Sequence, residues 1–75
     1  MHPAARQELK QLVEIYAFRT RQISEALAVL GGHVTAKREI DEIMTEIKKR
    51  RGLAEQAATD LFAFVWPRAE EPPNE

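Results

Sequence analysis

Two heptad patterns, separated by a pair of glycines, constrain the fold of this chain more than any other feature. In the first pattern, residues recur at alternating intervals of four and three: Leu9, Val13, Tyr16, Thr20, Ile23, Leu27 and Leu30. In the second, the intervals alternate between three and four: Ile40, Ile43, Ile47, Arg50, Ala54, Ala57, Leu61 and Phe64. Such spacing draws one stripe along a helix and is typical of coiled-coil seams. The sequence therefore predicts two long helices that pack through these stripes.

Local signals place the ends of the two helices. Pro3 suits the first turn of a helix, where its missing N–H is no loss. Gly31 or Gly32 can close the first helix in the left-handed conformation, and Thr35 is a good N-cap for the second. Pro67 stops the second pattern. We expect a hairpin over residues 1–66, with helices over about 3–30 and 35–65 and a loop over 31–34, followed by a disordered, acidic, proline-rich tail over 67–75.

Gly52 leaves two architectures open. A glycine inside a helix costs about 1 kcal/mol relative to alanine, and a break at this point would give a three-helix bundle. The heptad register passes through Gly52 without a phase shift, however, and places this residue on the outer face, which favours an unbroken second helix. We therefore predict an all-α fold, a two-helix antiparallel hairpin with a coiled-coil-like seam.

The small size of the chain predicts self-association. A chain of 75 residues buries a small fraction of its surface, and the absence of cysteine excludes disulfides and thiolate metal sites as additional support. A single hairpin needs one apolar stripe per helix, yet Phe18 lies almost opposite Tyr16 and Ile23. We expect a homo-oligomer, with a dimer as the first guess, assembled as a four-helix bundle or a larger helical oligomer.

Apolar residues outside the seams are candidates for contact with another protein: Ile15, Phe18, Phe62, Val65 and Trp66. The stretch LFAFVWP is the most concentrated apolar segment, and a helix that is apolar all round must be surrounded. Two interpretations remain open. The stretch closes the open end of the hairpin against the first helix, or it does so and also anchors a partner protein, because aromatic side chains in pockets dominate interface energies.

The run Lys48–Arg51 consists of four consecutive cations, which point all around a helix. Arg50 falls on the seam, where we expect its stem to lie on Tyr16, near Thr20, and its charge to pair with Glu14 or another carboxylate. Such a polar layer fixes register at some loss of stability. The alternative is a phosphate-contact patch that binds nucleic acid through its backbone, formed by Lys48, Lys49 and Arg51.

The sequence offers no constellation that indicates catalysis, a metal or a cofactor. His2 and His33 are the only histidines, and neither has a second ligand at a useful spacing. Glu39, Glu42 and Glu46 share one helical face, but the Glu-x-x-His element of di-iron bundles is absent. A solvated face with i,i+4 ion pairs explains these carboxylates better. We expect a protein that is not an enzyme and uses no cofactor.

Apolar runs in the chain are too short to span a bilayer, and the first ten residues lack an apolar signal-peptide core. We therefore expect a cytoplasmic protein without a membrane partner. Two function classes follow. The first is a non-enzymatic interaction protein, a small subunit, adaptor or inhibitor, which docks an apolar helix face on another protein. The second is an oligomeric nucleic-acid-associated regulator that uses the basic midsection of the second helix.

Overall fold

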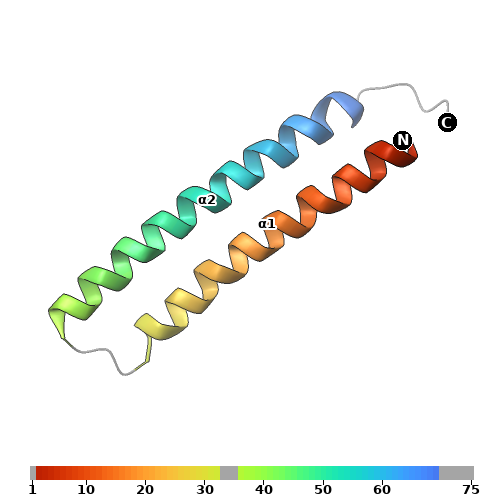
Figure 1. Ribbon diagram of the computed structural model, residues 1–75. Coiled ribbons are helices and arrows are strands. Elements are labelled where there is room, and N and C mark those ends of the chain that lie inside the picture. Colours follow the sequence, from red (N-terminus) through yellow and green to blue (C-terminus); the bar gives the residue numbers. More distant parts are fainter. Residues whose placement is uncertain (1, 33–35, 70–75) are drawn as a thin grey trace.

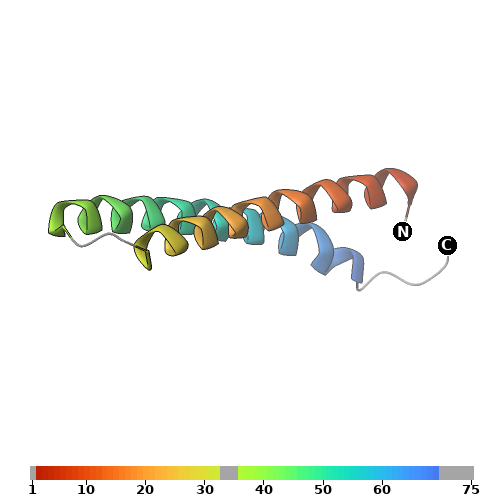
Figure 2. The same ribbon diagram turned by 90° about the horizontal axis from the view of Figure 1, so that it is seen from below.

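The computed structural model describes residues 2–32 and 36–69, and these residues form two α-helices in an antiparallel hairpin (Figure 1). Helix α1 spans Pro3–Leu30, and α2 spans Lys37–Ala69. The two helices cross at a shallow angle (Figure 2). The start of α1 and the end of α2 lie at the same end of the hairpin, opposite the loop. The predicted all-α antiparallel hairpin is confirmed.

Backbone hydrogen bonds mark the ends of α1. Pro3 occupies the first turn, and the His2 carbonyl accepts the first helical bond from the Arg6 N–H at 2.9 Å. At the other end, the Gly31 N–H donates to the Leu27 carbonyl, and the Gly32 N–H donates to the Val29 carbonyl at 3.1 Å. The prediction of a left-handed glycine cap is wrong, since Gly31 has φ −79° and both glycines avoid positive φ. The Gly31 bond is an ordinary α-helical one, and only the Gly32 bond to Val29 tightens to a three-residue span.

Helix α2 begins where the Ala36 carbonyl accepts a hydrogen bond from the Ile40 N–H at 3.0 Å. The predicted N-cap, Thr35, and the loop histidine, His33, lie outside the described residues. The helix continues through Gly52, so the three-helix alternative is excluded. Gly52 is exposed, and a Cβ atom built on it would meet nothing within 4 Å. Packing therefore does not require glycine at this position.

The end of α2 differs from the prediction. Pro67 lies inside the helix, which ends at Ala69 rather than near residue 65. Pro67 lacks the N–H that would bond the carbonyl four residues earlier. Arg68 supports the same turn, because its Nη1 donates to the Phe64 carbonyl at 2.8 Å and its guanidinium lies 3.8 Å from the centroid of the Phe64 ring. The remainder of the predicted tail, residues 70–75, lies outside the described residues.

The seam of α2 is the predicted one. Ala54, Ala57 and Phe64 are buried, and the other predicted seam positions are half-buried: Ile40, Ile43, Ile47, Arg50 and Leu61. The small side chains of Ala54 and Ala57 let the two helices approach closely at the middle of the hairpin.

The seam of α1 is half correct. Leu9, Thr20, Ile23 and Leu30 are half-buried as predicted, whereas Tyr16 is 37% exposed. Val13 and Leu27 are 45% and 49% exposed, and their predicted places are taken by the residues one position earlier, Leu12 and Ala26. The predicted stripe with Val13 and Leu27 and the observed stripe with Leu12 and Ala26 lie on opposite sides of the shared Leu9–Leu30 stripe. The prediction of the bulkier residues was wrong because Ala26, 5% exposed, allows a closer approach of the backbones.

Candidate interaction surfaces

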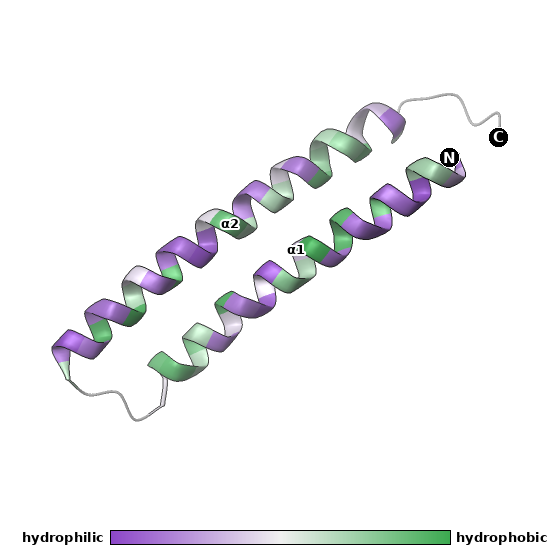
Figure 3. Ribbon diagram, viewed as in Figure 1, coloured by the Kyte–Doolittle hydropathy of each residue, from purple (hydrophilic) through white to green (hydrophobic). Residues whose placement is uncertain are grey.

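The hairpin leaves most of its large apolar side chains open to solvent. Among the described residues, four are buried, and three of these are alanines. Ten large hydrophobic residues are 37% to 65% exposed. The chain exposes 6019 Å², whereas a compact protein of its mass exposes about 4,700 Å². Apolar segments recur along both helices and gather near the end of α2 (Figure 3). One hairpin alone therefore does not complete a hydrophobic core.

The seam divides the surface of the hairpin into two faces. A shallow hollow bridges the helices and is lined by Glu25, Ala26 and Val29 of α1 and by Ile43, Glu46 and Arg50 of α2. This hollow shows which flanks of the two helices lie on the same side. Residues whole heptads away occupy the same flank. Ile15 lies two heptads before Val29, and Leu53 lies one heptad after Glu46, so both belong to this side.

This side, which we call the acidic face, combines apolar and negatively charged residues. Its apolar members are Ile15, Phe18, Val29 and Leu53, which are 40% to 55% exposed. At the flank positions of this side the described helices carry one cation, Lys49, and six carboxylates. The carboxylates are Glu8, Glu25, Glu39, Glu42, Glu46 and Asp60. Two seam arginines reduce this charge, because Arg50 lines the hollow and pairs with Glu46, and Arg19 lies over the Phe18 ring. The face keeps a net negative charge around an apolar centre.

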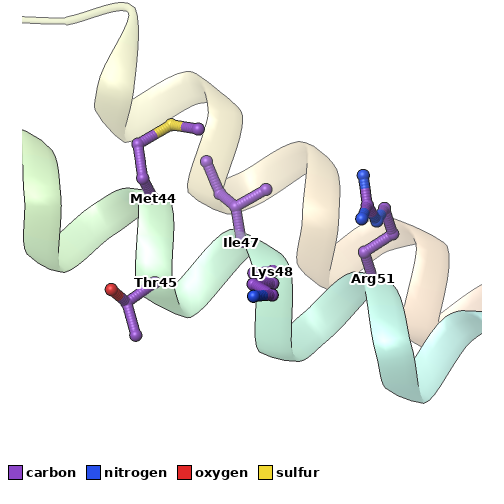
Figure 4. Close-up of a pocket in the computed structure, with 5 residues that line it drawn as sticks. All are labelled: Met44, Thr45, Ile47, Lys48 and Arg51. Atoms are coloured by element: carbon purple, nitrogen blue, oxygen red, sulfur yellow. The ribbon is translucent and has the colours of Figure 1, made fainter.

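The opposite side, which we call the basic face, is also apolar but positively charged. Its apolar members are Val13, Leu27, Met44, Ala58, Phe62 and Val65. This face has two carboxylates, Asp41 and Glu55. Its cations outnumber them and are Arg6, Lys10, Lys37, Lys48 and Arg51. A second shallow hollow lies on this face beside Met44, Ile47 and Arg51, which project toward α1, whereas Thr45 points away (Figure 4).

The five predicted interaction residues form two groups that the structure does not bring together. Ile15 and Phe18 belong to the acidic face and line a shallow hollow with Gln11 and Glu14. The others lie near the end of α2. Phe62 and Val65 belong to the basic face, and Trp66 is exposed on the outside of the helix.

The aromatic stretch of α2 is divided between the seam and the surface. Leu61 and Phe64 pack in the seam, whereas Phe62 and Trp66 are 64% and 65% exposed and lie one turn apart on the outside of the helix. Closure of the hairpin therefore accounts for only part of the stretch. Val65, half-buried, lies between the two environments.

Arg50 forms the polar layer that its seam position predicts, and the carboxylate with which it pairs is Glu46 rather than Glu14. Its side chain is 27% exposed, Nε donates to Glu46 Oε1 at 3.0 Å, and Nη1 donates to the Gln22 carbonyl at 2.7 Å. The predicted neighbours Tyr16 and Thr20 lie nearer the open end. The difference arises because α2 extends past the end of α1 at the loop (Figure 1), so the two helices are not paired end to end as predicted.

The other three cations of the basic run do not form one stripe. Lys48 belongs to the basic face and Lys49 to the acidic face, and neither forms an ion pair with a described residue. Arg51 lies 3.6 Å from Glu55, measured from Nε to Oε1. A phosphate backbone that follows one side of the hairpin would meet only part of this set.

The carboxylates Glu42 and Glu46 pair with cations one turn away, Arg38 and Arg50. Within residues 2–32 and 36–69, no group of three or more potential ligands could hold a metal ion. The described part of the chain contains no helix both long and apolar enough to cross a membrane. Comparison of the chain with protein-family models, curated proteins and solved structures finds no match. Function is therefore inferred from the chain's own surfaces.

Proposed function

We propose that this protein is a non-enzymatic interaction module, a small helical subunit, adaptor or inhibitor, that docks an apolar helix face on another protein. The observation that supports the proposal is the contrast between four buried residues and ten exposed large hydrophobic residues in one hairpin. Monomeric soluble proteins rarely leave contiguous apolar surface uncovered, and larger patches mark interaction sites. In this proposal the protein acts in the cytoplasm, the compartment that its sequence favours.

The aromatic pair Phe62 and Trp66 is the strongest candidate anchor for a partner. Both side chains are about two-thirds exposed and stand one turn apart on α2. Complete burial of one large apolar side chain contributes about 1.5–3 kcal/mol, and interface hot spots are enriched in tryptophan. Val65 adds apolar surface beside Phe62. Ile15 and Phe18 provide a separate, smaller anchor on the acidic face.

Self-association is part of the proposal. A stable interface removes about 800 Å² of surface from each partner, and the two apolar faces of this hairpin offer surface of that kind. An interface between copies would also add to the small core formed by Ala26, Ala54, Ala57 and Phe64. We expect a homo-oligomer whose assembly begins with a dimer.

The alternative function, a nucleic-acid-associated regulator, draws on Lys48 and Lys49, which are exposed. Their divergent directions weaken it, because phosphate contacts on one groove need cations on one side. Salt separates the two classes, since phosphate contacts fade steeply as salt rises, whereas apolar docking does not.

Affinity capture from the native cell at high salt, after nuclease treatment, tests the proposal. Three baits are compared: wild type, Phe62→Ser with Trp66→Ser, and a control, Thr59→Ser with Gln56→Ser, in which two exposed polar residues of the same helix change. We expect one set of proteins to be retained by wild type and control and lost by the aromatic double variant. The proposal would be contradicted if all three baits retained the same proteins, or if nuclease treatment removed every protein that the wild type retains.

A further inference from the structure

We propose that a second copy of this chain covers the two faces, with the basic face of one copy docked on the acidic face of the next. This inference rests on the proposed function in taking the apolar faces to be protein-binding surfaces. Its own observation is that one hairpin carries two apolar faces of opposite charge on opposite sides of a single seam.

Both faces have apolar centres of comparable exposure. On the acidic face, Ile15, Phe18 and Leu53 are 48%, 49% and 40% exposed. On the basic face, Val13, Leu27 and Met44 are 45%, 49% and 49% exposed. An assembly that used only one face would leave the other apolar centre in water. When the basic face of one copy docks on the acidic face of the next, both apolar centres are covered in every copy that has a neighbour on each side.

Charge selects between the two ways of pairing. A symmetric dimer through the basic face would set Arg6, Lys10 and Lys48 against the same cations of its partner, and a symmetric dimer through the acidic face would set Glu8, Glu25 and Asp60 against themselves. Like charges across an interface oppose association, and complementary potentials favour it. Basic-on-acidic docking is the arrangement in which the charges of the two faces compensate.

The size of a face matches what a stable interface needs. Helix α1 has 28 residues, which gives a face about 40 Å long, and two helices side by side are about 20 Å wide. The resulting area is about 800 Å², which equals the usual contribution of one partner to a standard protein interface.

The two faces are different surfaces, so their association is heterologous. A heterologous interface generates a ring when the rotation between copies closes, and an open chain when it does not. A dimer is then only the first step of assembly. This outcome differs from a symmetric four-helix bundle of two hairpins, which ends at the dimer and leaves one apolar face of each copy exposed.

Charge reversal on one face at a time tests the proposal by multi-angle light scattering. The first variant combines Glu8→Lys, Glu25→Lys and Asp60→Lys on the acidic face. The second combines Arg6→Glu, Lys10→Glu and Lys48→Glu on the basic face. All six positions are exposed. We expect the wild type to exceed the mass of a dimer, each variant alone to run as a monomer, and an equimolar mixture of the two variants to regain a larger mass.

Three results would overturn the inference: a wild type no heavier than a dimer, either variant keeping the wild-type mass by itself, or a mixture that stays monomeric. Circular dichroism checks that both variants remain helical. If either variant unfolds, the proposal is tested by how the mass of the wild-type assembly changes with salt concentration. Screening weakens attraction between complementary exposed charges, so the mass should fall as salt rises, and a constant or rising mass would contradict the proposal. A monomeric wild type would leave the proposed docking on another protein intact, because the capture experiment tests that separately.

Discussion

Replacement of Gly52 by alanine should stabilise the protein. Gly52 lies inside α2, is exposed, and has nothing within 4 Å of the position that a Cβ atom would take. Alanine therefore adds no clash and removes the entropic cost of an interior glycine, about 1 kcal/mol. For a domain of this size, that gain corresponds to a rise of about 4–8 °C in melting temperature.

Thermal unfolding followed by circular dichroism measures this gain. Because assembly links stability to concentration, the variants are compared at equal protomer concentration. Ala17→Gly is the matched control, since Ala17 is exposed in the middle of α1, and it should lower the melting temperature by a similar amount. An unchanged or lower melting temperature for Gly52→Ala would refute the reasoning, because it would mean that α2 bends or breaks at this residue.

Five further substitutions test the seam and the end of α2 in the same thermal-unfolding assay. Arg50→Leu should keep or raise stability, because a partly buried charge is often replaceable by an apolar side chain; a loss above about 2 kcal/mol would show that the bond to the Gln22 carbonyl is needed. Arg68→Ala should cost about 1 kcal/mol through the lost carbonyl bond and cation–π contact, and Arg68→Lys should restore only part of it; equal melting of wild type and Arg68→Ala would contradict this role. Ala26→Asp should unfold much of the hairpin, whereas Leu27→Asp should leave monomer helicity intact. If Leu27→Asp unfolded the hairpin and Ala26→Asp did not, the seam of α1 would run through Leu27 rather than Ala26.

The sequence predicted the seam of the second helix better than the seam of the first, for a reason visible in its residues. In α2, a single stripe from Ile40 to Phe64 is more apolar than its neighbours, and the structure uses it. In α1, the stripe through Leu9 and Leu30 is flanked on both sides by apolar residues. Side-chain size favoured Val13 and Leu27, but the close approach of the two backbones favoured Ala26. Which stripe of α1 packs in the seam depends on the surface of α2, so the pattern within α1 alone could not predict it.

The end of α2 and the backbone acceptor of Arg50 were predicted less well. Pro67 is a strong stop signal by itself, yet Arg68 and Phe64 together support one more turn. The polar layer at Arg50 followed from its seam position, whereas its acceptor, the Gln22 carbonyl, depends on how far α2 extends past α1. The charges of the two faces also depend on the pairing, because the pairing decides which flank of α1 lies on the same side as which flank of α2.

The mass of the wild-type protein in solution tests the central claim, that copies of the chain cover the exposed apolar faces of this hairpin, most directly. Sedimentation velocity at several micromolar concentrations and moderate salt would measure it. We predict species heavier than a dimer of the 8.6 kDa protomer, with a mass that grows with concentration for an open chain or settles at a fixed multiple for a ring. A single 8.6 kDa species that stays fully helical at every concentration would contradict the claim that copies of the chain cover these faces.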